Sequence, residues 1–170
     1  MNRNHLILLA IAILTVPLLW LFVPKSEPGS LRSLEGVSLS TVNGEKFKLS
    51  SLFAEKPTLL VFWSVTCGSC IEEIPFIIKL HGQLKDRLTI IGVHQAGFPL
   101  AKIQKFLKKY PERIPYLLAI DDDQKLTTTF EVGVMPRIIL LNRRGEVQFS
   151  HLGYAPEMEA EILHEITSKL

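Results

Sequence analysis

Two cysteines, Cys67 and Cys70, are the only thiols of this chain and the side chains best suited to do chemistry. Two residues separate them, and they follow a continuous apolar run, Thr58 to Trp63, at the start of a helical pattern. A pair of thiols between a strand and a helix is placed to form and break a disulfide bond. The spacing therefore predicts a redox-active disulfide between Cys67 and Cys70.

Other uses of a Cys-x-x-Cys pair fit the surrounding residues less well. Haem attachment needs a histidine directly after the second cysteine, and Ile71 stands there instead. A zinc site needs four ligands, usually with a second Cys or His pair at short spacing. The candidate histidines are scattered singly along the chain, at His81, His94, His151 and His164. We therefore expect no metal site and no cofactor.

Two further classes of function stay open at this point. A copper chaperone would hold Cu(I) on both thiolates, with His94 as a further candidate ligand. A peroxidase would use Cys67 as its peroxidatic thiol, with Ser64 three residues before it, but the proline of the peroxiredoxin motif is absent and Leu60 lies in the strand.

The start of the helix makes the two thiols unequal. Cys67 lies where unpaired backbone N–H groups and the helix dipole favour an anion. A stabilisation of ~1–2 kcal/mol lowers a thiol pKa by about 0.7 to 1.5 units from ~8.5. We expect Cys67 to attack a substrate disulfide and Cys70, one turn deeper, to resolve the mixed disulfide.

Strands that alternate with helices must position this pair. Residues 36–42 and 46–49 alternate around an Asn43-Gly44 turn, which predicts an N-terminal β-hairpin. Further strands are expected at 58–63, 88–93, 116–120, 137–141 and 147–151, and helices at 67–84, at 100–110, before Phe130 and after Pro156. This order predicts an α/β fold with a mixed central sheet flanked by helices on both faces.

Length and charge limit the remaining possibilities. The 170 residues suggest one domain plus an extension, and the formal net charge of +2 is spread without a long basic run. Because phosphate binding depends on clustered Lys and Arg, a nucleic-acid partner is not expected.

An uninterrupted apolar stretch, Leu6 to Val23, precedes the domain. As a helix it would cover about 27 Å, close to the ~30 Å hydrocarbon core of a bilayer. The alternative is a cleaved signal peptide, but the residues after the stretch offer no small-x-small cleavage site. We predict a signal anchor or transmembrane helix at residues 1–24, a linker at 25–35 and a folded domain at 36–170. The flanking charges are too few to give its orientation.

A resemblance follows from the motifs around the cysteines. Phe62-Trp63-x-x-x-Cys67-Gly68-x-Cys70 with a proline at 75, and Gly133-Val134-Met135-Pro136 before an apolar strand, resemble the thioredoxin superfamily. The resemblance covers about residues 36–170 and implies a thioredoxin-like fold. It also implies a cis peptide bond before Pro136, which would face the cysteines, and substrate contacts at Met135, Trp63 and Thr66.

Within that superfamily the anchor, the hairpin and the extra strand-helix segment at 88–120 resemble the TlpA/ResA/CcmG (DsbE) group. This resemblance implies a bacterial protein with a single pass in the inner (cytoplasmic) membrane and a soluble domain on the periplasmic or extracytoplasmic side. It implies reduction of protein disulfides, apocytochrome c among them, with electrons from a membrane donor of the DsbD or CcdA type. An oxidant or copper-stress protein resembling ScsD, or a copper-binding thioredoxin-like chaperone, is the alternative.

Several residues depart from the family pattern or admit two readings. Thr66 replaces a tryptophan, Ser69 a proline, and Val61 the buried aspartate of thioredoxin itself. Glu73 matches a glutamate of ResA-like proteins, which implies a proton shuttle for Cys70. The other reading of Glu73 is a solvated acid in the first turn of a helix, where the dipole favours it.

Other polar residues of the chain read as structural. We expect His94 to be a satisfied residue at the end of a strand, although this place would also let it approach the site. We expect Arg137 to be a surface side chain, the alternative being a preference for acidic substrate segments. Trp63 is expected to pack under the site. The run Asp121 to Asp123 lacks the spacing of a calcium loop and reads as a solvated turn and helix cap.

Overall fold

The computed structural model describes residues 34–53 and 55–170. The predicted membrane segment at 1–24 and residues 25–33 of the predicted linker lie outside these described residues. Within the described part of the chain, no helix combines the length and apolar character needed to cross a bilayer. Leu34, which the prediction assigned to the linker, is fully buried in the core, so the folded part already includes it.

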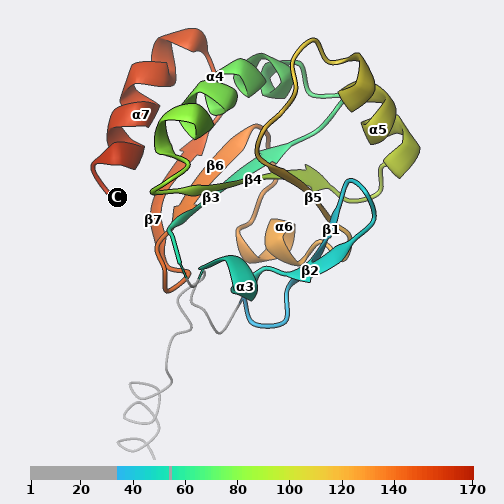
Figure 1. The fold of residues 1–170 in the computed structure, drawn as a ribbon, viewed down its shortest axis with the longest axis horizontal. Coiled ribbons are helices and arrows are strands. Elements are labelled where there is room, and N and C mark those ends of the chain that lie inside the picture. Colours follow the sequence, from blue (N-terminus) through green and yellow to red (C-terminus); the bar gives the residue numbers. More distant parts are fainter. Residues whose placement is uncertain (1–33, 54) are drawn as a thin grey trace, which may run out of the picture.

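A seven-stranded mixed sheet forms the centre of the fold, in the order β2-β1-β5-β4-β3-β6-β7 (Figure 1). β3, β4 and β5 are parallel, and the other neighbours pair antiparallel. The strands are β1 Ser38–Thr41, β2 Lys46–Lys48, β3 Thr58–Trp63, β4 Thr89–Gln95, β5 Leu117–Asp121, β6 Arg137–Leu141 and β7 Val147–Leu152. Each predicted strand is present, with ends that differ by a few residues, and this confirms the predicted sheet.

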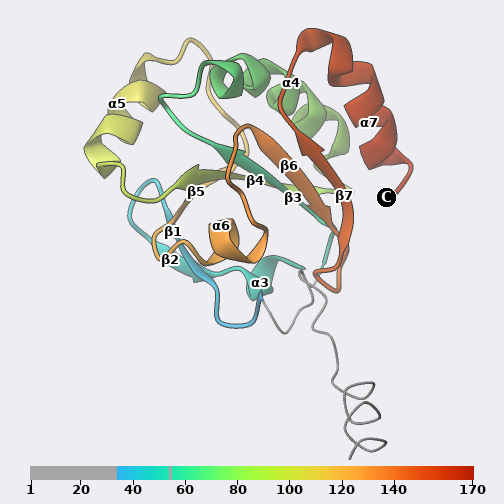
Figure 2. The same ribbon diagram turned by 180° about the vertical axis from the view of Figure 1, so that it is seen from behind.

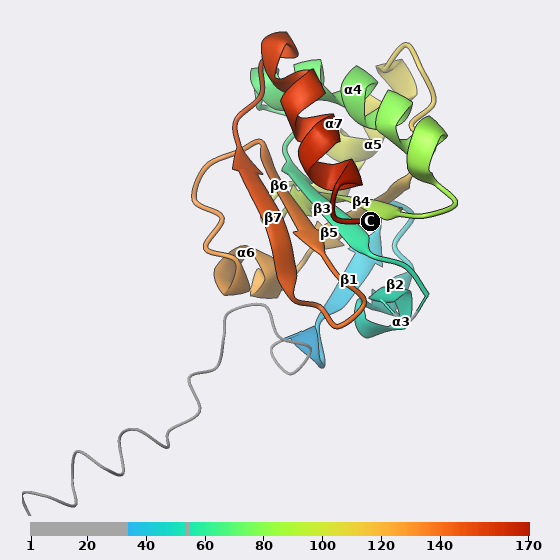
Figure 3. The same ribbon diagram turned by 90° about the vertical axis from the view of Figure 1, so that its left-hand side faces the viewer.

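Helices cover both faces of the sheet. The views from the front, from behind and from the side show α4, α5 and α7 over one face and the short α3 and α6 over the other (Figures 1, 2 and 3). The helices are α3 Ser50–Phe53, α4 Gly68–Leu84, α5 Leu100–Lys109, α6 Lys125–Thr129 and α7 Glu159–Thr167, with a 3₁₀ turn at Pro156–Met158 before α7. The last predicted helix is thus α-helical only from Glu159, after one tighter turn.

β3 is apolar throughout because it is buried on both faces. Its side chains alternate between the two hydrophobic cores, as the geometry of a strand requires. Leu59, Val61 and Trp63 enter the core under α4, whereas Leu60 and Phe62 enter the core on the other side. A strand held in this way gives the segment that follows it a fixed starting point.

Candidate redox site at the end of β3

The two cysteines lie where β3 passes into α4, and they form a disulfide. Cys67 is the N-cap residue of α4, with extended backbone angles φ −99° and ψ 109°. Its Sγ accepts a hydrogen bond from the backbone N–H of Cys70 at 3.2 Å. The sulfur therefore takes the place that a Ser or Asp oxygen takes at other helix starts, and a thiolate there would be stabilised by the same donor.

Exposure separates the two sulfurs. Cys70 is 1% exposed, whereas Cys67 is half-buried and reaches the surface. The Ser69 hydroxyl lies 3.7 Å from Cys67 Sγ and the carbonyl oxygen of Met135 lies 3.8 Å from it. Because only the Cys67 sulfur is open to another molecule, the geometry favours Cys67 as the attacking thiol and Cys70 as the resolving one.

The loop before β6 faces the disulfide. The peptide bond between Met135 and Pro136 is cis, as the family resemblance implied. The carbonyl of Pro136 accepts a hydrogen bond from the N–H of Gly153 at 2.8 Å, so the residue that follows β7 holds the loop in place. Val134 is 61% exposed and Met135 is half-buried beside it. This edge of the site can therefore meet an incoming chain.

The other expected substrate contacts lie at different depths. Thr66 is exposed, and its hydroxyl lies 3.0 Å from that of Ser64. Trp63 is 3% exposed, with its ring edge-on to His94 at a centroid distance of 5.1 Å. Thr66 and Met135 are thus at the surface, whereas Trp63 supports the site from below.

Glu73 is the acid nearest in sequence after Cys70, and it is buried. Its side chain is 1% exposed, and Oε1 has no hydrogen-bond partner among the described residues. Burial raises the pKa of Glu73 from 4.5 to about 8. The reading of Glu73 as a solvated first-turn acid is therefore wrong, while the neighbouring Glu72 is exposed.

The position of Glu73 on α4 explains its burial. Cys70, Glu73, Ile77 and Leu80 are spaced by three or four residues and share the buried face of the helix. The sequence carried this signal, because Glu73 falls on the apolar stripe of the helix. At neutral pH the raised pKa keeps Glu73 protonated in the oxidised protein, so this carboxyl can hold the proton that Cys70 gives up.

Sequence reasoning allowed His94 to approach the site from the end of its strand, but it did not identify the contact with the segment before Cys67. His94 is fully buried, and its Nε2 accepts a hydrogen bond from the Val65 N–H at 3.1 Å. Its Nδ1 donates to the carbonyl of Gln95 at 2.7 Å. The expectation of a satisfied strand-end histidine is confirmed, but one of its partners belongs to the redox site.

The remaining polar candidates lie elsewhere. Asp121 is fully buried and accepts from the N–H groups of Leu126 and Thr127 and from the Thr127 hydroxyl, so it holds the start of α6. The expected cap is confirmed, whereas the expectation that Asp121 is solvated is wrong. Arg137 is half-buried and lines a small pocket with Glu131.

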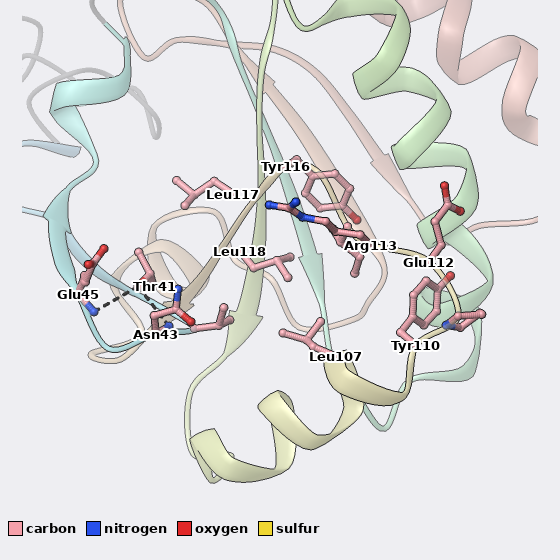
Figure 4. Close-up of a pocket in the computed structure, with 13 residues that line it drawn as sticks. Thr41, Asn43, Glu45, Leu107, Tyr110, Glu112, Arg113, Tyr116, Leu117 and Leu118 are labelled. Carbon is pink, nitrogen blue, oxygen red and sulfur yellow. Dashed lines mark hydrogen bonds between the residues drawn. The ribbon is translucent and has the colours of Figure 1, made fainter.

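A pocket of about 590 Å³ lies apart from the cysteines, between the hairpin, the end of α5 and the start of β5 (Figure 4). Tyr110, Arg113 and Tyr116 point toward it from the segment between α5 and β5. None of the redox-site residues lines it. The disulfide is thus reached from an open surface and not through this pocket.

Comparison with known proteins agrees with this geometry. A family model described as Redoxin matches residues 28–166. The thiol-disulfide oxidoreductase ResA of Halalkalibacterium halodurans is 29% identical over 128 residues, which are 75% of this chain and 71% of that protein. The thiol-disulfide oxidoreductase YkuV of Bacillus subtilis is 28% identical over 116 residues, 66% of this chain and 76% of that protein.

Solved structures share the fold. MTB dsbF is 25% identical with a TM-score of 0.68, and the match covers 81% of this chain and 97% of that one. StoA from Bacillus subtilis is 18% identical with a TM-score of 0.63, covering 76% of this chain and 94% of that one. The fold of the described residues is therefore thioredoxin-like.

Proposed function

The chain belongs to the Redoxin family and is a thiol-disulfide oxidoreductase, and we propose that it works as a membrane-anchored reductant of protein disulfides outside the cytoplasm. One observation carries the proposal. An accessible Cys67 at a helix N-terminus is paired with a buried Cys70, and the buried acid Glu73 follows one helical turn later. This arrangement suits attack, resolution and proton storage in sequence.

The reaction begins with the reduced form of the pair. The Cys67 thiolate attacks one sulfur of a substrate disulfide, forms a mixed disulfide and releases the other substrate sulfur as a thiolate. Cys70 then loses its proton and attacks Cys67 Sγ. The products are the Cys67–Cys70 disulfide and the second substrate thiolate, so two electrons have passed to the substrate.

Glu73 supplies the proton acceptor for the second step. A thiol at Cys70 is buried in apolar surroundings, which disfavour its thiolate. In its ionised form the Glu73 carboxylate, one turn away, can take this proton. It then keeps the proton in the oxidised protein, where burial raises the pKa of Glu73 to about 8. When a donor reduces the disulfide again, the same carboxyl returns the proton to Cys70.

The direction of electron flow is testable through the reduction potential of the Cys67–Cys70 couple. A reductant of protein disulfides should have a potential below about −200 mV, whereas strong oxidants lie near −120 mV. Equilibration with thiol buffers of known potential, followed by alkylation, measures it. A value above about −150 mV would refute a reducing role and favour the oxidant or ScsD-like alternative.

The substrate class is tested by trapping. In Cys70→Ser the mixed disulfide on Cys67 cannot be resolved, so a substrate should remain bound as a covalent complex. We expect a peptide with the paired cysteines of an apocytochrome c to be captured, and a membrane donor of the DsbD or CcdA type to be captured in host cells. Cys67→Ser is the matched control, and capture of these partners on Cys70 instead would reverse the assigned roles.

The proposed location rests on the apolar stretch from Leu6 to Val23 and on the resemblance to the TlpA/ResA/CcmG group. We expect the full chain to stay with the cytoplasmic-membrane fraction after alkaline extraction. The reduced Cys67 thiol should react with a membrane-impermeant labelling reagent that is added outside intact cells or spheroplasts. Release by alkaline extraction, or labelling only after lysis, would contradict this placement.

A further inference from the structure

His94 lies where β3 and β4 separate, next to the segment that leads to Cys67. Trp63 and His94 are the last residues of the two strands in register. Beyond this pair the chain leaves the sheet, and the N–H of Val65 no longer faces a strand. A backbone donor in this position needs an acceptor, and the Nε2 of His94 supplies it at 3.1 Å.

Two hydrogen bonds and two ring contacts hold the imidazole of His94 in place. Nδ1–H donates to the Gln95 carbonyl at 2.7 Å, which leaves Nε2 as the unprotonated acceptor. The ring is edge-on to Trp63, and the ring of Phe98 lies 5.7 Å away, centroid to centroid. Burial lowers the pKa of His94, in opposition to the smaller effect of the hydrogen bond to Gln95, so the acceptor form is the stable one.

We propose that His94 is a positioning residue for the attacking thiol: through Val65 it holds the segment between β3 and α4 so that Cys67 stays aligned with the first turn of α4. This inference rests on the proposed role of Cys67 as nucleophile and adds a residue of the neighbouring strand to the machinery that sets its reactivity.

The link from Val65 to Cys67 is short and stiff. One residue, Thr66, separates them, and the N–H of Cys67 is itself bonded to the Ser64 carbonyl at 3.0 Å. The favourable effect of a helix N-terminus falls off within the first turn. If Val65 lost its acceptor, Cys67 would shift away from the N–H of Cys70, and its thiolate would be less stabilised.

The test measures the reactivity of Cys67 alone, in the full chain carrying Cys70→Ser. The rate of alkylation by iodoacetamide is followed against pH for the parent and for His94→Phe, which keeps a ring but has no acceptor. We expect the rate at pH 7 to fall about two- to fivefold, as it does when a thiol pKa near 7 rises by roughly half to one unit. His94→Gln can place Oε1 near the position of Nε2 and should restore most of the rate.

Two controls separate this effect from a general loss of stability. Val93→Ala removes apolar volume from the adjacent residue of β4, whose side chain enters the core on the other face of the sheet. It should lower the unfolding midpoint but leave the alkylation profile unchanged. If His94→Phe does not fold, His94→Asn replaces it, because the shorter side chain cannot reach the Val65 N–H.

The outcomes are decisive in both directions. Slower alkylation of Cys67 in His94→Phe (or His94→Asn), together with a restored rate in His94→Gln, supports the proposal. It is overturned if His94→Phe reacts like the parent, if His94→Gln is as slow as the variant without an acceptor, or if Val93→Ala shifts the profile equally. A chain that failed to reduce protein disulfides would count against the proposed function and would leave this comparison of thiol reactivity intact.

Discussion

Replacing Glu73 by glutamine should make the protein progressively more stable relative to the wild type as the pH rises from 5 to 7. Glu73 has a pKa of about 8 in the folded protein, against 4.5 for an exposed glutamate. Between these two values the folded state binds a proton that the unfolded state has released. Folding stability therefore falls as pH rises through this window, by at most about 1.4 kcal/mol per pH unit. Glutamine does not titrate, so the stability of the variant does not fall with pH for this reason.

The magnitude follows from the two pKa values. Relative to Glu73→Gln, the wild-type protein should lose about 1 kcal/mol at pH 5 and about 3 kcal/mol at pH 7. The glutamine amide brings its own unpaired donors at a cost of about 1–3 kcal/mol, and this offset does not depend on pH. The informative quantity is therefore the change between the two pH values, about 2 kcal/mol in favour of the variant.

Urea unfolding of the oxidised protein at pH 5, 6 and 7 measures this change. Other titrating groups shift both proteins alike, so the difference between variant and wild type isolates Glu73. Glu72→Gln, at the exposed neighbouring position, is the matched control and should show no comparable gain. If the free-energy difference between Glu73→Gln and wild type stays constant from pH 5 to pH 7, Glu73 does not hold a proton in the folded protein over this range.

A kinetic assay on Glu73→Gln and two other substitutions test separate parts of the molecule. Glu73→Gln should slow resolution of the Cys67 mixed disulfide by about 100-fold, the lower range for general base catalysis, in single-turnover release of a substrate thiol; an unchanged rate would remove Glu73 from the proton transfer. Asp121→Ala should cost about 2–4 kcal/mol, because three donors at the start of α6 lose their acceptor; thermal unfolding measures it, and a loss below about 1 kcal/mol would contradict the cap. Gly92→Ala should lower the free energy of unfolding by about 1–3 kcal/mol, since its Cβ would lie 2.8 Å from Leu118 Cδ2. A thermal unfolding midpoint equal to that of the wild type would show that Leu118 on β5 moves aside at little cost.

The local features of the fold could be predicted because local rules govern them. The Asn43-Gly44 turn gives the hairpin, and Gly44 adopts φ +90°, where a side chain would be strained. β3 was predicted with both of its ends, because its apolar run stops where the chain leaves the sheet. The strand-to-helix junction then fixes the place of the cysteine pair.

Features that depend on tertiary contacts were harder to predict. The burial of Glu73 could have been predicted from its place on the apolar stripe of α4, but a charged residue near the start of a helix is usually solvated. The bond from Val65 to His94 depends on the register of β3 against β4 and on the point where they separate. A sequence pattern gives neither the register of the two strands nor the point where they separate.

The two thiols are thus controlled from different elements. Glu73 lies on the same helix as Cys70, so their separation is fixed by helix geometry and does not depend on the sheet. His94 lies on β4 and reaches Cys67 through the segment that connects β3 to α4. With Val61 where thioredoxin itself has its buried aspartate, the strand contributes only apolar surface to the core that contains Cys70. The proton acceptor for the resolving thiol therefore lies on α4, and the residue that aligns the attacking thiol lies on the sheet. A substitution at Glu73 can thus alter Cys70 without displacing Cys67, and one at His94 can alter Cys67 without displacing Cys70.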